Sequence, residues 1–225
     1  MLQAIIFDMD GVIVDTEYVD FQLQSQMIRS IAKDPERLTH EDFSSLVGRS
    51  YQDLLGAIKV LSQTELSLAE IEERLERVAE QKYFQMDYEK LFRKDIIQIL
   101  DFAKERGIKL AVASSSRKTH ILEVLQACGI AGYFDTVVSG EDFAASKPHP
   151  AIYQAALESL GIAADQALAV EDSTYGILAA KRAGLTVLAY EEKRMVIDQS
   201  LADYKGADMK AIFEYIQDLQ GKIEG

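Results

Sequence analysis

Two aspartates follow the first apolar run of the chain. The residues Ala4 to Phe7 carry no polar break, which is typical of a strand buried on both faces. Asp8, Asp10 and Gly11 come next, and because alternate residues of a strand project the same way, both carboxylates would lie on one side of its carboxyl end. Like charges this close raise each other's pKa unless a cation lies between them, and Mg²⁺ prefers such oxygen ligands. Alternatively, the aspartates simply open a loop.

Further polar residues stand where later apolar runs end. They are Ser114 and Ser115 after one run, Lys147 in a loop, and Glu171 and Asp172 after another run. Ligands of open α/β sheets bind at the carboxyl ends of the strands, so we expect these residues to converge on the two aspartates. Such a set can perform phosphoryl chemistry, with one carboxylate attacking phosphorus, another managing a proton and the rest holding Mg²⁺. The structural alternatives are helix caps for the serine and the acids and an exposed lysine.

Strands and helices alternate after Leu91. Strand-like runs at 109–113, 136–138, 167–170 and 186–189 alternate with helical segments at 96–105, 119–127, 151–160 and 175–183. This order indicates βαβ units and a parallel sheet. The segment 17–91 shows only helical periodicity. We therefore predict an α/β fold: a Rossmann-like parallel-sheet core flanked by helices, formed by 1–15 and 92–225, with an inserted α-helical bundle cap domain at 16–91.

The composition narrows the choice of partners and compartment. A net charge of −13 over 225 residues disfavours nucleic acid and anionic membranes. No apolar run reaches about 18 residues, and no basic stretch precedes an apolar one at the N-terminus. The one cysteine, Cys128, can form no intrachain disulfide, which suits a reducing compartment. We expect a cytoplasmic, monomeric protein that binds a small phosphorylated metabolite, with no nucleic acid and no membrane as partner.

Four motifs carry a more specific pattern. They are the segments Asp8 to Glu17, Val112 to Ser116, Ser146 to Pro148 and Val170 to Ser173. Together they resemble the haloacid dehalogenase superfamily, and within it the β-phosphoglucomutase-like phosphatases with a helical cap. The resemblance covers nearly the whole chain.

The resemblance implies a role for each matching residue. Asp8 would be the nucleophile that forms an aspartyl-phosphate, and Asp10 the general acid and base. The phosphoryl group would be held by Ser114, Ser115 and Lys147. The Mg²⁺ site would comprise Asp8, the backbone carbonyl of Asp10, Asp172, and Glu171 acting directly or through water.

The cap loop is expected to set substrate specificity through Gly48, Arg49, Ser50 and Tyr51. The sugar phosphomutases of this group have a histidine where this chain has Asp20, and an arginine three residues after the loop glycine, where this chain has Tyr51. The pair Arg93-Lys94 also replaces a Pro-Gly that is common in relatives.

These departures favour hydrolysis over isomerisation. We predict a Mg²⁺-dependent phosphatase that hydrolyses a small organic phosphate, such as a sugar phosphate, through an aspartyl-phosphate. The alternative is a phosphomutase of the β-phosphoglucomutase type. A third reading is a regulatory module like a phosphorylation receiver, which shares the clustered acids, hydroxyl and lysine. Receiver domains have no large helical insertion after the first strand, so the segment 17–91 speaks against this reading.

Overall fold

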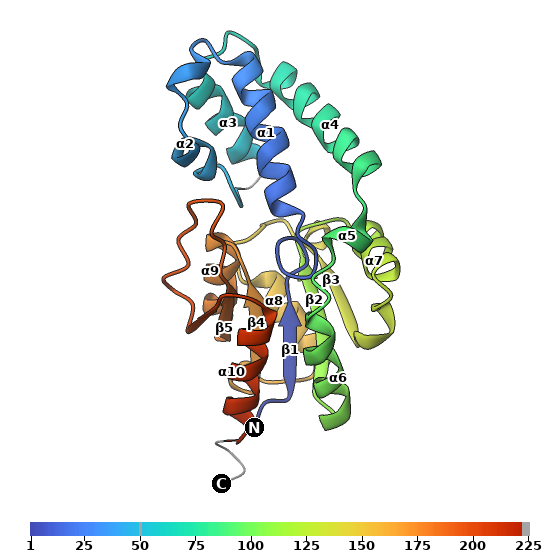
Figure 1. Ribbon diagram of the computed structural model, residues 1–225. Helices are drawn as coiled ribbons and strands as arrows, with labels where there is room; N and C mark the ends of the chain where they lie inside the picture. The colour runs from blue at the N-terminus through green and yellow to red at the C-terminus, as the bar shows by residue number, and fades with distance from the viewer. Residues whose placement is uncertain (50, 222–225) are drawn as a thin grey trace. The chain divides into compact units, whose positions relative to one another are not determined.

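A parallel sheet forms the centre of the larger part of the molecule (Figure 1). The computed structural model describes residues 1–49 and 51–221, without the side chains of residues 51, 52 and 81–85. Six strands within this part of the chain pair in the order β3-β2-β1-β4-β5-β6, all parallel. Their bounds are β1 Ala4–Phe7, β2 Lys109–Ser114, β3 Thr136–Ser139, β4 Ala167–Glu171, β5 Thr186–Tyr190 and β6 Tyr204–Gly206. The predicted α/β class is confirmed.

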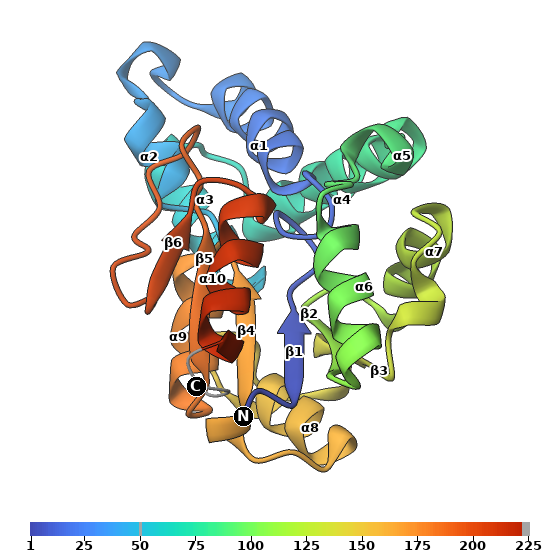
Figure 2. The same cartoon turned by 60° about the horizontal axis from the view of Figure 1, so that its bottom comes forward.

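Helices lie in the connections from β1 to β5, and one more helix follows β6. The helices that belong to the sheet unit are α5 Tyr88–Leu91, α6 Ile96–Arg106, α7 Lys118–Ala127, α8 Ala151–Leu160, α9 Thr174–Arg182 and α10 Met209–Gly221. Short 3-10 turns lie at Ala131–Tyr133, Gly140–Asp142 and Ala164–Gln166. The strand β6 at the edge of the sheet (Figure 2) and the helix α10 were not predicted from sequence.

Side chains alternate between the two faces of the sheet, as a period of two requires. Ile5 and Phe7 face a cluster completed by α6, α7 and α10, whereas Ala4 and Ile6 face one completed by α8 and α9. In Figure 1, α6 and α10 lie in front of the sheet and α8 behind it. The α8 face is lined by small residues, Ala4, Ala111, Ala113, Ala167, Ala169 and Ala189. This face therefore has room for the bulky Tyr153 of α8, which is fully buried.

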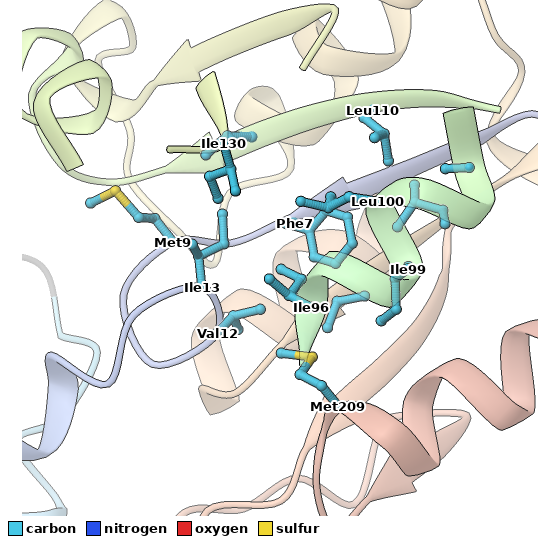
Figure 3. Close-up of a cluster of buried hydrophobic side chains, with 14 of the residues drawn as sticks. Phe7, Met9, Val12, Ile13, Ile96, Ile99, Leu100, Leu110, Ile130 and Met209 are labelled. Carbon is cyan, nitrogen blue, oxygen red and sulfur yellow. The ribbon is translucent and has the colours of Figure 1, made fainter. Parts of the chain in front are cut away.

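The turn after β1 is built into the core. Met9, Val12 and Ile13 are fully buried and pack in the same cluster as Phe7 (Figure 3). Gly11 takes a φ of 81°, a backbone conformation that a side chain disfavours. The apolar residues of the turn hold the backbone rigidly where Asp8 and Asp10 emerge.

A second compact unit is helical and has its own core. It contains α1 Glu17–Ile31, a 3-10 turn at Pro35–Arg37, α2 His40–Ser44, α3 Tyr51–Ser62 and α4 Leu68–Gln85. Its buried side chains come from every one of these α-helices; Phe21, Phe43, Ile58 and Ile71 are examples. The capping box at the start of α4 is present, since the amide of Glu70 donates to Ser67 Oγ at 3.3 Å.

The division of the chain differs from the sequence expectation in two respects. The helical unit spans Thr16–Asp87, so that α5 belongs to the sheet unit, and it also includes Glu192–Ile197 from the segment after β5. Met195 is buried in the helical core, and the amide of Val196 donates to Ser44 Oγ at 3.0 Å. These contacts join segments far apart in sequence, and therefore helical periodicity along 16–91 could not reveal them.

A half-buried arginine ties together segments of the sheet unit. Arg93 donates to Asp15 Oδ1 at 2.8 Å, to the hydroxyl of Tyr190 at 2.7 Å and to the carbonyl of Gly11 at 3.2 Å. Its guanidinium also lies 3.9 Å from the centroid of the Tyr190 ring. This network, the Arg93 clamp, links the turn after β1 to the end of β5. Arg93 therefore does more than replace a hinge proline.

In the described part of the chain, no helix is both long and apolar enough to span a lipid bilayer.

Replacing Arg93 by alanine should destabilise the sheet unit by about 1–3 kcal/mol, because it removes the hydrogen bonds that the guanidinium donates to a partly buried carboxylate and to a backbone carbonyl. Urea unfolding would measure the loss. Arg77→Ala is the matched control, since Arg77 pairs with Glu73 at 2.5 Å on an exposed helix surface. Its replacement should change the free energy of unfolding by no more than about 0.5 kcal/mol. Equal losses in the two variants would contradict a structural role for the clamp.

Candidate active site

The strand register places two acids side by side. Phe7 of β1 is in register with Val170 of β4, and the amide of Asp8 donates to the carbonyl of Val170 at 3.0 Å. Asp8 therefore lies beside Glu171, the last residue of β4. Both have the parity of the strand residues that face α8 and α9. Two carboxylates thus meet at the carboxyl edge of the sheet, on the α8 side.

Lys147 lies between these two carboxylates. Its Nζ is 2.7 Å from Asp8 Oδ1, 2.7 Å from Glu171 Oε1 and 3.2 Å from the carbonyl oxygen of Ala113. The lysine is buried, as are both acids. Burial alone lowers the pKa of the ammonium, but Asp8 and then Glu171 raise it above its usual range. Lys147 therefore stays charged and bridges the two strands.

One lysine does not balance the cluster. Burial raises the pKa of Asp8 from 3.8 to about 7; Lys147 opposes this, while Glu171 and Asp10 add to it. Among the described residues, ligand oxygens of Asp8, Glu171 and Asp172 lie within 4.8 Å of one another. A carboxylate that holds its proton to near neutrality beside two more acids favours a further cation. Oxygen donors at this density fit Mg²⁺.

The backbone comes very close to Asp172. A Cβ on Gly11 would lie 1.9 Å from Asp172 Oδ2, so only glycine fits between the turn after β1 and this carboxylate. The carbonyl of Asp172 accepts from Gln199 Nε2 at 2.6 Å, and the same amide donates to the carbonyl of Tyr190 at 2.7 Å. Buried Asp172 is thus held from both sides.

A serine contacts the second aspartate. Ser116 Oγ donates to Asp10 Oδ2 at 2.9 Å, and the amide of Ser116 donates to Ser114 Oγ at 3.1 Å. Ser114 is buried at the end of β2, whereas Ser115 is exposed. The structure therefore brings Ser114 to the carboxyl edge of the sheet, next to β1. Ser116, in the turn that follows β2, connects this turn to Asp10.

Glu171 has partners on both oxygens. Oε1 accepts from Lys147 and from the hydroxyl of Tyr153, which lies at 2.5 Å. Oε2 accepts from the amide of Asp172 at 3.1 Å and from the amide and hydroxyl of Ser173 at 3.4 and 3.3 Å. Burial, and then the nearby Glu171, raise the pKa of Tyr153 well above 10.0, so its hydroxyl keeps the proton that it donates.

The predicted cap residues lie in the helical unit. Gly48 has a φ of 76°, and the Nε of Arg49 donates to the carbonyl of Ser45 at 2.8 Å. Both line a cavity of about 180 Å³ within this unit, together with Asp20. Ser50 lies outside the described residues, and so does the side chain of Tyr51, whose backbone begins α3.

Comparison with known proteins identifies the family. The family described as haloacid dehalogenase-like hydrolase matches residues 5–190. The chain belongs to this family. A phosphorylated carbohydrates phosphatase of Thermotoga maritima is 30% identical over 187 residues, which cover 82% of each chain. A beta-phosphoglucomutase of Bacillus subtilis is 28% identical over 214 residues, 92% of each chain. The crystal structure of beta-phosphoglucomutase from Clostridium difficile superposes with a TM-score of 0.76 at 24% identity and covers 99% of both chains.

Two contacts of this haloacid dehalogenase-like site were not predicted from sequence. Ser116 follows the two serines that were predicted, and only the folded turn shows that its hydroxyl reaches Asp10. Tyr153 lies among apolar residues of α8 and looks like a core position. The available signal in the sequence is a tyrosine at an apolar position of the helix, because a hydroxyl that is buried there must find a hydrogen-bond partner.

The pKa of Asp8 predicts how Mg²⁺ binding depends on pH. Below about pH 7 the proton on Asp8 competes with the metal, so the apparent Kd should fall roughly tenfold per pH unit as the pH rises and level off above pH 7. Calorimetric titration of the metal-free protein with MgCl₂ between pH 5.5 and 8.5 measures this. A Kd that does not change below pH 7 would contradict the raised pKa.

Proposed function

We propose that this protein is a Mg²⁺-dependent phosphatase that hydrolyses a small organic phosphate through an aspartyl-phosphate at Asp8. The observation that carries the proposal is the buried Lys147 ammonium, which lies 2.7 Å from Asp8 Oδ1 and 2.7 Å from Glu171 Oε1. A carboxylate held by a cation at the carboxyl edge of the sheet is a suitable nucleophile for phosphorus. Membership of a hydrolase family and similarity to a carbohydrate phosphatase support the same reading.

In the first step an oxygen of Asp8 forms a bond to phosphorus while the bond from phosphorus to the leaving oxygen breaks. Asp10 gives its proton to that oxygen, and the product leaves as a neutral alcohol. Ser116 Oγ, 2.9 Å from Asp10 Oδ2, fixes the orientation of this acid. The phosphoryl group is then attached to Asp8.

In the second step Asp10 acts as a base. It takes a proton from water, the water oxygen bonds to phosphorus, and the bond from phosphorus to Asp8 breaks. Inorganic phosphate leaves and both carboxyl groups return to their starting state. One residue serves as acid and then as base because Asp10 loses a proton in the first step and regains one in the second.

The remaining residues neutralise and position the phosphoryl group. Lys147 is the nearest fixed cation to Asp8 and would bind phosphoryl oxygens, assisted by the hydroxyl of Ser114. Asp8, Asp172 and the backbone carbonyl of Asp10, with Glu171 in support, would hold Mg²⁺. The ion, when bound, offsets the negative charge of the phosphate.

Asp8→Asn should lower kcat by roughly 10³-fold or more with the fold intact, because the variant keeps the shape and loses the nucleophile. Asp10→Asn should lose about 10²–10⁴-fold and accumulate phosphorylated Asp8 with an activated ester. Phosphate release from p-nitrophenyl phosphate and intact-protein mass spectrometry measure the two effects.

The matched control for these variants is Asp101→Asn, which changes a surface carboxylate that accepts from Tyr133 at 2.7 Å. It should keep wild-type rates. A kcat of Asp8→Asn within about tenfold of wild type would disprove the nucleophile assignment. Phosphorylated Asp8 that persists in the wild-type protein without turnover would instead favour the regulatory-module reading.

A phosphomutase is the second candidate, favoured by the similarity to a beta-phosphoglucomutase along 92% of the chain. Such an enzyme must bind a bisphosphate in two orientations and needs a clamp for the distal phosphate. The cavity in the helical unit offers Arg49 beside the acids Glu17 and Asp20, which is an unfavourable setting for a second phosphate. We therefore assign hydrolysis, with Gly48 and Arg49 as the proposed specificity residues.

β-Glucose 1-phosphate distinguishes the two candidates. With Mg²⁺ alone we expect inorganic phosphate and glucose in equal amounts and no glucose 6-phosphate; with glucose 1,6-bisphosphate as primer, glucose 6-phosphate should not exceed the amount of primer added. Enzymatic assay of all three products measures this. Primer-dependent conversion without release of phosphate would establish the mutase and overturn the interpretation of Asp20.

A further inference from the structure

Tyr153 brings a polar group into an otherwise apolar helix face. Its side chain is fully buried against the alanine-rich face of the sheet. The hydroxyl donates to Glu171 Oε1 at 2.5 Å, and the ring centroid lies 5.2 Å from Lys147 Nζ. Phenylalanine would fill the same space and keep the ring beside the ammonium. The hydroxyl is thus not needed to pack α8, and its position must be explained by Glu171.

The hydroxyl completes the set of donors around Glu171. Lys147 is the other donor to Oε1, while Oε2 accepts hydrogen bonds from the backbone amides of Asp172 and Ser173. A carboxylate held from both ends cannot rotate without breaking a hydrogen bond to a charged group, and such bonds are stronger than neutral ones. The orientation of Glu171 therefore determines the position of the Lys147 ammonium and of the backbone that carries Asp172.

We propose that Tyr153 is a positioning residue of the active site, which acts through Glu171 to keep Lys147 shared with Asp8 and to hold the Asp172 backbone for metal binding. Without the Tyr153 hydroxyl, Lys147 is the one remaining donor to Glu171 Oε1 in the part of the chain that the structure describes. Glu171 then attracts the ammonium away from Asp8. The inference rests on the proposed function for the roles of Asp8 and Lys147. The contact between Tyr153 and Glu171 does not depend on it.

Tyr153→Phe removes only the hydroxyl. We expect the Kd for Mg²⁺, measured by calorimetry on the metal-free protein at constant pH, to rise by about tenfold, as is usual when a residue that orients a metal-site group is changed. The matched control is Tyr133→Phe, which deletes a tyrosine–carboxylate hydrogen bond of 2.7 Å to Asp101 on the surface. Its Kd should stay within about twofold of wild type. Thermal melts verify that both variants fold.

A double-mutant cycle tests whether the effect passes through Glu171. In a Glu171→Gln background, Tyr153→Phe should change the Kd for Mg²⁺ by less than about twofold, because the carboxylate that Tyr153 positions has been replaced by an amide. A full tenfold effect in that background would overturn the route through Glu171. If Glu171→Gln does not fold, the comparison of Tyr153→Phe with Tyr133→Phe decides alone.

The outcomes separate this inference from the proposed function. A Kd for Mg²⁺ that Tyr153→Phe leaves within about twofold of wild type overturns the positioning role, even if the enzyme hydrolyses phosphate esters. Absence of Mg²⁺ binding by the wild-type protein overturns it as well. Mg²⁺ binding that depends on Tyr153, in a protein that releases no phosphate from any ester, would overturn the proposed function and leave the positioning role in place.

Discussion

The buried ammonium of Lys147 lies 2.7 Å from a carboxylate oxygen of Asp8 and 2.7 Å from one of Glu171. Removing one partner from such a buried set leaves an uncompensated charge, which is strongly unfavourable. Burial raises the pKa of Asp8 to about 7, Lys147 opposes this, and Glu171 and Asp10 add to it. Asp172 brings a further acid to the cluster. The same imbalance that destabilises the ionised cluster favours the uptake of a further cation.

The sheet makes this arrangement possible through its register and its choice of side chains. In-register pairing of β1 with β4 sets Asp8 beside Glu171, and the strand period directs both toward α8. Alanines along that face leave room for Tyr153. Larger strand residues there would move α8 outward, away from Glu171. The packing of the core and the hydrogen bonding of the site are therefore one and the same constraint.

The sequence predicts a feature of the fold or the site well when residues close together along the chain determine it, and poorly when residues far apart along the chain do. The run that ends at Asp8 and the one that ends at Glu171 are local patterns, so both strand ends and the parallel sheet could be predicted. The partners of Glu171 could not, because they depend on the way that α8 returns across the sheet. The docking of Met195 in the helical core likewise depends on a contact between segments far apart in the chain. No local period encodes such contacts.

The residues assigned to chemistry all belong to the sheet unit, whose turn after β1 is held by Met9 and its apolar neighbours on one side and by the Arg93 clamp on the other. The helical unit has a separate core and its own small cavity. Because the two units have separate cores, side chains of the helical unit can change without disturbing the packing around Asp8 and Lys147. The chain is similar to a phosphatase along 82% of its length and to a phosphomutase along 92%. The fold shared with these relatives does not by itself determine substrate or reaction, which depend on individual side chains.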